Sequence, residues 1–159
     1  MSIASVKAVP EDMRTSMIRI YSYEDRNPKG VFYNLYYGRK IVFENLTQLL
    51  FLMEDLMDSM GYPQASVKSR GFRDVPQQAD RASLMKQMDL DPDQKALATF
   101  KVKVLFRQSA SWQGRVWWVD QEKEMSFRST LELIKLMDST LPQPENNMPT
   151  VENEVADIG

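Results

Sequence analysis

Two stretches of equal length carry the pattern from which the fold is inferred, GVFYNLYYGRKIVFENLTQLLFLM at residues 30–53 and GRVWWVDQEKEMSFRSTLELIKLM at residues 114–137. When they are aligned at an offset of 84 positions, Gly30 meets Gly114 and Phe43 meets Phe127. The helical positions Leu49, Leu52 and Met53 meet Leu133, Leu136 and Met137. Because the turn glycine, the strand phase and the helical spacing agree in one register, the sequence predicts an internal duplication.

Each copy reads as three strands followed by a helix. Alternating apolar residues predict strands at 17–23, 31–37 and 40–43, and again at 101–107, 114–119 and 123–127. Asn45 and Ser129 are good N-cap residues, with Gln48 and Glu132 three positions later as in a capping box. We therefore expect one helix after Asn45 that ends near Gly61, and a second after Ser129 that ends before Pro142.

These elements predict an α+β fold in which two tandem βββα repeats form one antiparallel sheet of about six strands. The two long helices should lie on one face, with their Leu and Met residues buried beside Phe43 and Phe127. The expected organisation is a flexible leader over 1–15, a single domain over 16–141 and a disordered acidic tail over 142–159. Within the domain, repeats at 16–62 and 100–141 flank a connecting segment at 63–99, which carries an extra helix at 77–88.

The composition excludes several kinds of chemistry. The chain has no cysteine and no histidine, which removes disulfides, Cys/His zinc sites and nucleophile–His catalysis. The acidic run from Asp89 to Asp93 lacks the glycine and final acid of a calcium loop, so we predict no metal site and no cofactor. No stretch is long and apolar enough for a membrane span or a signal peptide, and we expect a cytoplasmic protein without a membrane partner. An enzyme that uses carboxylates and a bound metal stays open without a feature that favours it.

The strand phase predicts a basic and aromatic face. Along the first strand of each copy, apolar residues alternate with polar or aromatic ones, so one set should face the core and the other should face outward. The outward set, with one loop residue added, consists of Arg19, Tyr21, Tyr23, Arg70, Lys101, Lys103 and Arg107. Such a face could bind single-stranded nucleic acid, because aromatic rings stack on bases and cations neutralise phosphates. An ordinary solvated strand face is the alternative interpretation.

The second strands are apolar on both faces, which predicts an additional contact. Tyr33, Tyr37, Trp117 and Val119 oppose the core-facing set, and the connecting segment, a second copy or another protein could cover them. Trp112 is expected on a hairpin turn at 109–114, where it either packs against its own hairpin or is presented to a partner. Trp and Tyr often anchor protein interfaces, so these five residues are the candidate protein-binding set.

One resemblance adds to this picture. The stretch SWQGRVWW at 111–118, followed by FRSTLELIKLMD at 127–138, resembles small uncharacterised bacterial proteins with the same hairpin-to-helix signature. The resemblance covers residues 100–141, implies a widespread module and carries no catalytic residue with it. It implies that Trp112, Gln113, Gly114, Phe127 and Arg128 belong to a defined local structure.

The sequence thus favours a non-catalytic protein-binding or regulatory module that contacts another protein or itself. A single-stranded nucleic-acid-binding protein is the alternative.

Overall fold

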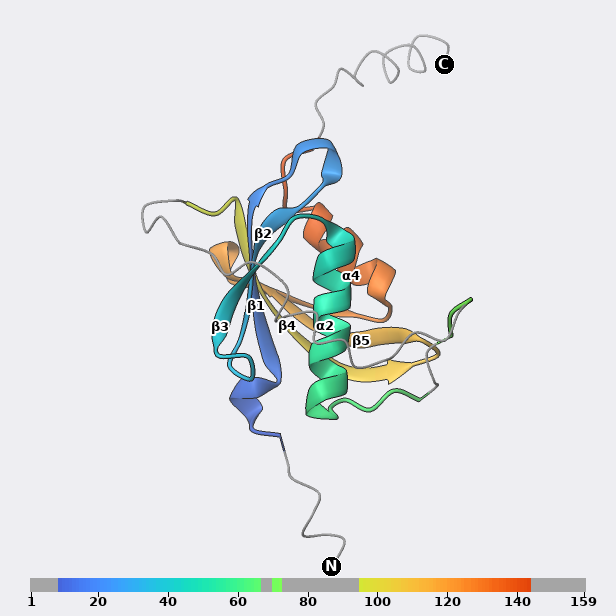
Figure 1. Ribbon diagram of the computed structural model, residues 1–159. Helices are drawn as coiled ribbons and strands as arrows, with labels where there is room; N and C mark the ends of the chain where they lie inside the picture. The colour runs from blue at the N-terminus through green and yellow to red at the C-terminus, as the bar shows by residue number, and fades with distance from the viewer. Residues whose placement is uncertain (1–8, 67–69, 73–94, 144–159) are drawn as a thin grey trace, which may run out of the picture.

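The computed structural model describes residues 9–66, 70–72 and 95–143. These residues form one antiparallel six-stranded sheet and two α-helices, which is the predicted α+β class (Figure 1). The strand order is β3-β2-β1-β4-β5-β6. The sheet is therefore built from two consecutive groups of three strands that meet at β1 and β4.

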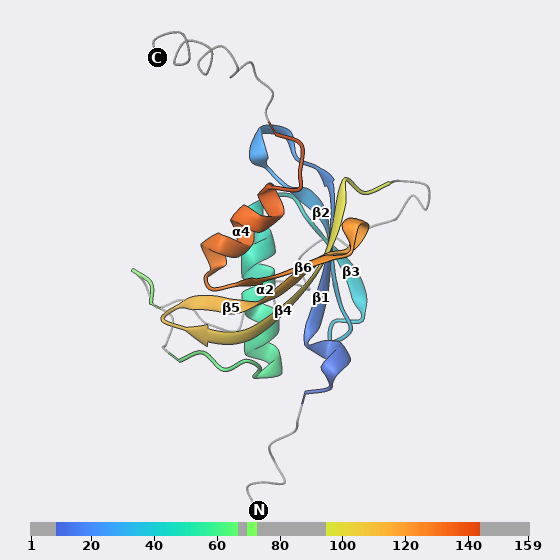
Figure 2. The same ribbon diagram turned by 180° about the vertical axis from the view of Figure 1, so that it is seen from behind.

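The element bounds agree closely with the sequence pattern. The first group has β1 (Thr15–Ser22), β2 (Lys29–Asn34), β3 (Arg39–Phe43) and then α2 (Leu46–Met60). The second has β4 (Ala98–Gln108), β5 (Ser111–Trp118), β6 (Lys123–Phe127) and then α4 (Thr130–Asp138). Three 3-10 turns accompany them: η1 (Glu11–Met13), η2 (Glu24–Arg26) and η3 (Val119–Gln121). Figure 2 shows β4, β5 and β6 from behind, with α4 beside them.

Both helices begin where the sequence predicts, and for the predicted reason. The Asn45 side chain accepts a hydrogen bond from the Gln48 N–H at 2.8 Å, and Ser129 Oγ accepts one from the Glu132 N–H at 3.0 Å. Gln48 and Glu132 in turn accept from the backbone N–H groups of the residues before the caps. These contacts satisfy amide groups that a helix start otherwise leaves unpaired. Helix α2 ends at Gly61, which has a left-handed backbone with φ of 70°.

One hydrophobic core joins the strands to both helices. The buried side chains at its centre are Ile18, Ile20, Phe32, Ile41, Phe43, Leu49, Leu52, Phe100, Val102, Phe127 and Leu133. Most of the predicted core is confirmed, but Leu136 is only partly buried and packs against the edge of this cluster. Helix α4 has nine residues and buries two of them, whereas α2 has fifteen and buries five. The shorter helix covers less of the sheet.

A register shift near the end of each first strand overturns part of the predicted face assignment. The pairing of β1 with β2 shifts between Ile20 and Ser22, and that of β4 with β5 shifts between Val104 and Phe106. One extra residue in a strand reverses the side on which every later side chain lies. Phe106, which strict alternation from Val102 and Val104 would place in the core, is therefore 53% exposed, whereas Arg107, predicted outward, is buried.

The hairpin between β4 and β5 is tighter than predicted. Its turn consists of Ser109 and Ala110, which have φ of 54° and 60°. Trp112 consequently lies in β5 opposite Arg107 and is 5% exposed, so the prediction of a tryptophan on the turn is wrong. Because the turn uses only two residues, residues 111–114, which were predicted to lie in the turn, belong to β5 instead.

Some predictions fall on other parts of the chain. The extra helix at 77–88 and most of the acidic tail at 142–159 lie outside the described residues. Glu11 to Met13 belong to the predicted leader and form η1, where Glu11 makes an ion pair with Lys103 of β4.

Candidate binding site

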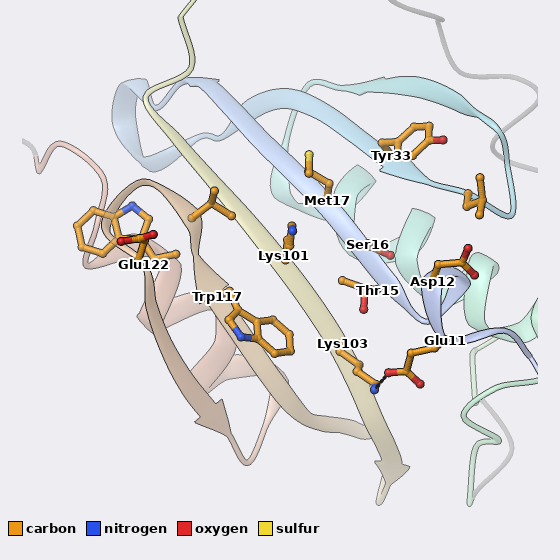
Figure 3. Close-up of a pocket in the computed structure, with 13 residues that line it drawn as sticks. Glu11, Asp12, Thr15, Ser16, Met17, Tyr33, Lys101, Lys103, Trp117 and Glu122 are labelled. Carbon is orange, nitrogen blue, oxygen red and sulfur yellow. Dashed lines mark hydrogen bonds and ion pairs between the residues drawn. The ribbon is translucent and has the colours of Figure 1, made fainter.

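The sheet face turned away from the core carries a row of side chains that crosses all six strands. Backbone register places Lys40 opposite Tyr33, Tyr33 opposite Met17 and Met17 opposite Lys101. Lys101 is opposite Trp117, and Trp117 is opposite Glu124. We call this face the outer face and these six residues the central row. Figure 3 shows Tyr33, Met17, Lys101 and Trp117 on four adjacent strands.

A wide hollow lies over the middle of the outer face. Its volume is about 990 Å³, and Met17, Tyr33, Leu35, Trp117 and Val119 provide much of its apolar lining. Leu35 and Val119 are 42% and 38% exposed. A volume of this size is in the range of sites that hold a ligand or several side chains of a partner.

A smaller hollow of about 240 Å³ extends the site toward β3. Met17 and Tyr33 line both hollows, and Arg19, Tyr21 and Lys40 complete the smaller one around Val31. The candidate site therefore spans the outer face from β3 to β5.

Charges of both signs surround the apolar centre. Arg19, Lys40 and Lys101 form no ion pair within the described part of the chain. Lys103, at the lower end of the hollow in Figure 3, instead donates a hydrogen bond to Glu11, and this bond lowers the pKa of Glu11 below its ordinary value.

Carboxylates stand at both ends of the hollow. Asp12 follows Glu11 at one end, and Glu122 lies at the other end beside η3. Lys101 is thus the cation nearest the middle of the row that has no carboxylate partner among the described residues.

The predicted protein-binding residues divide between the two sides of the sheet. Tyr33, Trp117 and Val119 line the hollow. Tyr37 packs against the core, with its ring 6.5 Å from that of Phe32 in an edge-on contact. Trp112 is buried, and its Nε1 donates to a Glu54 carboxylate oxygen at 2.8 Å. The outer face therefore brings together three of the five residues.

The predicted nucleic-acid-binding residues divide in the same way. Four of the seven, namely Arg19, Tyr21, Lys101 and Lys103, line one of the two hollows on the outer face. Arg70 is exposed in the segment 70–72, outside any strand. Tyr23 and Arg107 come after the two register shifts and turn to the core side instead.

The two inward-turned residues form polar contacts between the halves. Arg107 contacts Glu54 at 3.0 Å and Asp58 at 2.7 Å, and its Nε donates to the Pro63 carbonyl at 2.6 Å. The Tyr23 hydroxyl donates to Asp138 at 2.5 Å. Burial, together with this hydrogen bond as the second cause, raises the pKa of Tyr23 to about 12.

Sequence reasoning missed several residues of the site. Met17 could be inferred directly from the alternation that placed Ile18 in the core, and that signal was available. Lys40, Glu11 and Glu122 could not be found in this way, because their places depend on strand register and on how η1 and η3 fold over the sheet ends.

The described residues support neither a metal site nor a membrane-spanning helix. Within residues 9–66, 70–72 and 95–143, no group of three or more acidic side chains could hold a metal ion. Over the same ranges, every helix is too short or too polar to cross a membrane.

Comparisons with protein-family models, with curated proteins and with solved structures found no match to this chain.

Proposed function

We propose that this protein is a non-catalytic binding module whose outer face engages another protein. The observation that carries the proposal is the hollow of about 990 Å³, in which Tyr33 and Trp117 stand over an apolar floor. Large aromatic side chains at the centre of a surface are the usual anchors of protein interfaces. Contiguous apolar area on a sheet face is otherwise normally covered.

The charge distribution favours a protein over a nucleic acid. A nucleic-acid site needs a continuous cationic path, because phosphate contacts provide most of its affinity. Here Glu11, Asp12 and Glu122 stand at the ends of the hollow, and Lys103 is neutralised by Glu11. Apolar and aromatic side chains around one central lysine, with charges of both signs at the edge, match a protein interface better than a phosphate-binding path.

Two matched aromatic variants test the proposal. Capture of cross-linked partners from a lysate of the host cells, together with light scattering for self-association, should show a complex formed by the wild type. Trp117→Ala and Tyr33→Ala should weaken it. Leu131→Ala is the control, because Leu131 is 59% exposed on α4, outside the two hollows. Circular dichroism checks that each variant is folded.

Two results would contradict the proposal. One is a monomer whose captured proteins are unchanged by both aromatic variants. The other is tight binding to labelled single-stranded oligonucleotides that falls steeply as salt rises, since this indicates release of counterions from phosphates.

We also infer that the two halves are copies of one βββα unit, related by a pseudo-twofold axis, with both helices on the same face of the sheet. Residues 84 positions apart support the inference through equivalent contacts. A Cβ on Gly30 would stand 1.9 Å from the Arg19 carbonyl oxygen, and one on Gly114 would stand 2.0 Å from that of Lys103. Both register shifts also fall at matching positions.

Reciprocal contacts between the halves give further support. Tyr23 and Arg107 are 84 positions apart, and so are their partners Glu54 and Asp138, with each pair joining the end of a first strand to the opposite helix. A twofold axis produces this exchange of partners. The axis would pass between Met17 and Lys101, at the middle of the central row.

A further inference from the structure

We propose that the partner presents an extended acidic segment, with bulky apolar side chains at positions i and i+4 and a carboxylate at position i+2. This inference rests on the proposed function and names the chemistry that the outer face would recognise. The segment would lie across the strands, along the central row, with its apolar side chains on Tyr33 and Trp117 and its carboxylate near Lys101.

The spacing along the row matches an extended chain. Tyr33 and Trp117 are separated by three strand-to-strand steps, from β2 through β1 and β4 to β5. Steps of about 4.8 Å make this about 14 Å. Four residues of extended chain rise about 3.4 Å each and span nearly the same distance. Alternate side chains of such a segment face the sheet, so position i+2 falls midway between the two rings.

The charge at that midpoint selects a carboxylate. Met17 and Lys101 are the two residues at the middle of the row, and Lys101 is exposed with no ion pair inside the described ranges. The next cation along β4, Lys103, is already paired with Glu11. Arg19 and Lys40 add positive charge beside Tyr33, at one end of the row. An acidic residue at position i+2 is therefore complementary to the surface beneath it.

A second copy of the chain fits the face less well. Two outer faces packed around a twofold axis at the middle of the row would bring the Lys101 side chains of both copies together, because the carboxylates Asp12 and Glu122 stand at the ends of the hollow. Lys101 has no ion pair among the described residues. Like charges placed together at an interface are costly. The unpaired cations thus favour a partner of opposite charge over self-association.

Peptide selection tests the inference without a known partner. A random-peptide display library is selected on the intact protein and counter-selected on Trp117→Ala. We expect the enriched peptides to have an acidic residue with a bulky apolar residue two positions away on each side. Selected peptides that lack this pattern overturn the inference but leave the proposed function standing. If no peptide is selected, and the wild type and the outer-face variants capture the same proteins from the lysate, both this inference and the proposed function are contradicted.

A charge exchange gives the sharper measurement. The probe is a fluorescent peptide with the sequence Leu-Ser-Glu-Ser-Leu between short Gly-Ser ends, and its binding is measured by fluorescence anisotropy. Lys101→Glu should weaken binding about tenfold, the size of effect expected from one interfacial charge pair. A probe with lysine in place of glutamate should bind Lys101→Glu more tightly than it binds the wild type.

The controls separate charge at the site from charge in general. Lys135→Glu changes an exposed lysine on α4 and should leave binding unchanged. A probe with its two leucines three positions apart should bind more weakly than the original probe. Equal binding of the glutamate and lysine probes to the wild type would overturn the inference, as would preference for labelled oligothymidylate.

Discussion

The two halves of the chain run through the same order of strands and helix, yet residues 84 positions apart are buried to different extents. Ile41 in β3 is fully buried, whereas Met125, 84 positions later in β6, is 56% exposed. Leu52 is fully buried in α2, whereas its counterpart Leu136 in α4 is only partly buried. Both halves supply residues to the core cluster, but the two sets do not fall at the same positions.

Helix length and loop composition account for much of this difference. Helix α2 continues to Met60 and buries Leu56 beyond the point that corresponds to the end of α4, where the second half has the partly buried Thr140. Leu141, 84 positions after Met57, is buried like Met57 although it lies outside α4. In the loop after β2, Tyr37 packs back against the core, whereas the corresponding residues after β5 form the exposed turn η3. The comparison indicates that the same apolar sequence pattern can be buried to different extents. The neighbouring loop and the length of the helix determine how many of its side chains are covered.

The largest expected effect tests this difference in burial directly. Ile41→Ala should lower the free energy of unfolding by about 2–5 kcal/mol, because it leaves a cavity in the packed interior. Met125→Ala should change it by less than about 0.5 kcal/mol, since the side chain is mostly in water. Urea unfolding of both variants measures the contrast. Equal losses would mean that Met125 is packed as tightly as Ile41.

The reciprocal polar contacts should also differ in strength. Arg107→Met should cost about 3 kcal/mol, because it leaves Glu54 without its buried cationic partner. Tyr23→Phe removes one hydrogen bond to Asp138 and should cost about 1 kcal/mol. Thermal or urea unfolding provides the measurement. A larger loss for Tyr23→Phe would reverse the proposed ranking.

A third pair of residues 84 positions apart contrasts satisfied and unsatisfied polar groups. The Asn34 side chain donates to Met13 O at 2.9 Å and accepts from the Tyr36 N–H at 2.8 Å, and it is 1% exposed. Its counterpart Trp118 has a buried Nε1 with no hydrogen-bond partner among the described residues. Asn34→Ala should cost about 2 kcal/mol, whereas Trp118→Phe should cost less than about 1 kcal/mol. A loss for Trp118→Phe as large as that for Asn34→Ala would indicate that Nε1 has a partner.

The smallest expected effect concerns alkaline pH. The folded state raises the pKa of Tyr23 from 10.0 to about 12, so folding favours the protonated hydroxyl. This contribution to stability is fully present below pH 10 and is lost as the pH rises toward 12. Unfolding measured across that window should show a steeper decline for the wild type than for Tyr23→Phe. Parallel curves would mean that Tyr23 does not contribute.

Much of the fold could be predicted from local signals. The N-cap hydrogen bonds of Asn45 and Ser129 involve residues only three positions away, so the sequence contains both partners. The strands around Ile18 and Val102 were predictable because alternation is a property of consecutive residues. For the candidate site, the same alternation identified Tyr33, Lys101 and Trp117 as outward residues.

The class, the order of the elements and the starts of both helices follow from the sequence alone, because each depends on neighbours along the chain. The side of the sheet that Tyr23, Phe106 and Arg107 occupy became known only from the folded molecule, because an extra residue in a strand is visible only from its pairing with the next strand. The central row also depends on strand register, which places Lys40 opposite Tyr33 and Trp117 opposite Lys101. Hydrogen bonding between distant strands, rather than local preference, determines which outward side chains stand side by side.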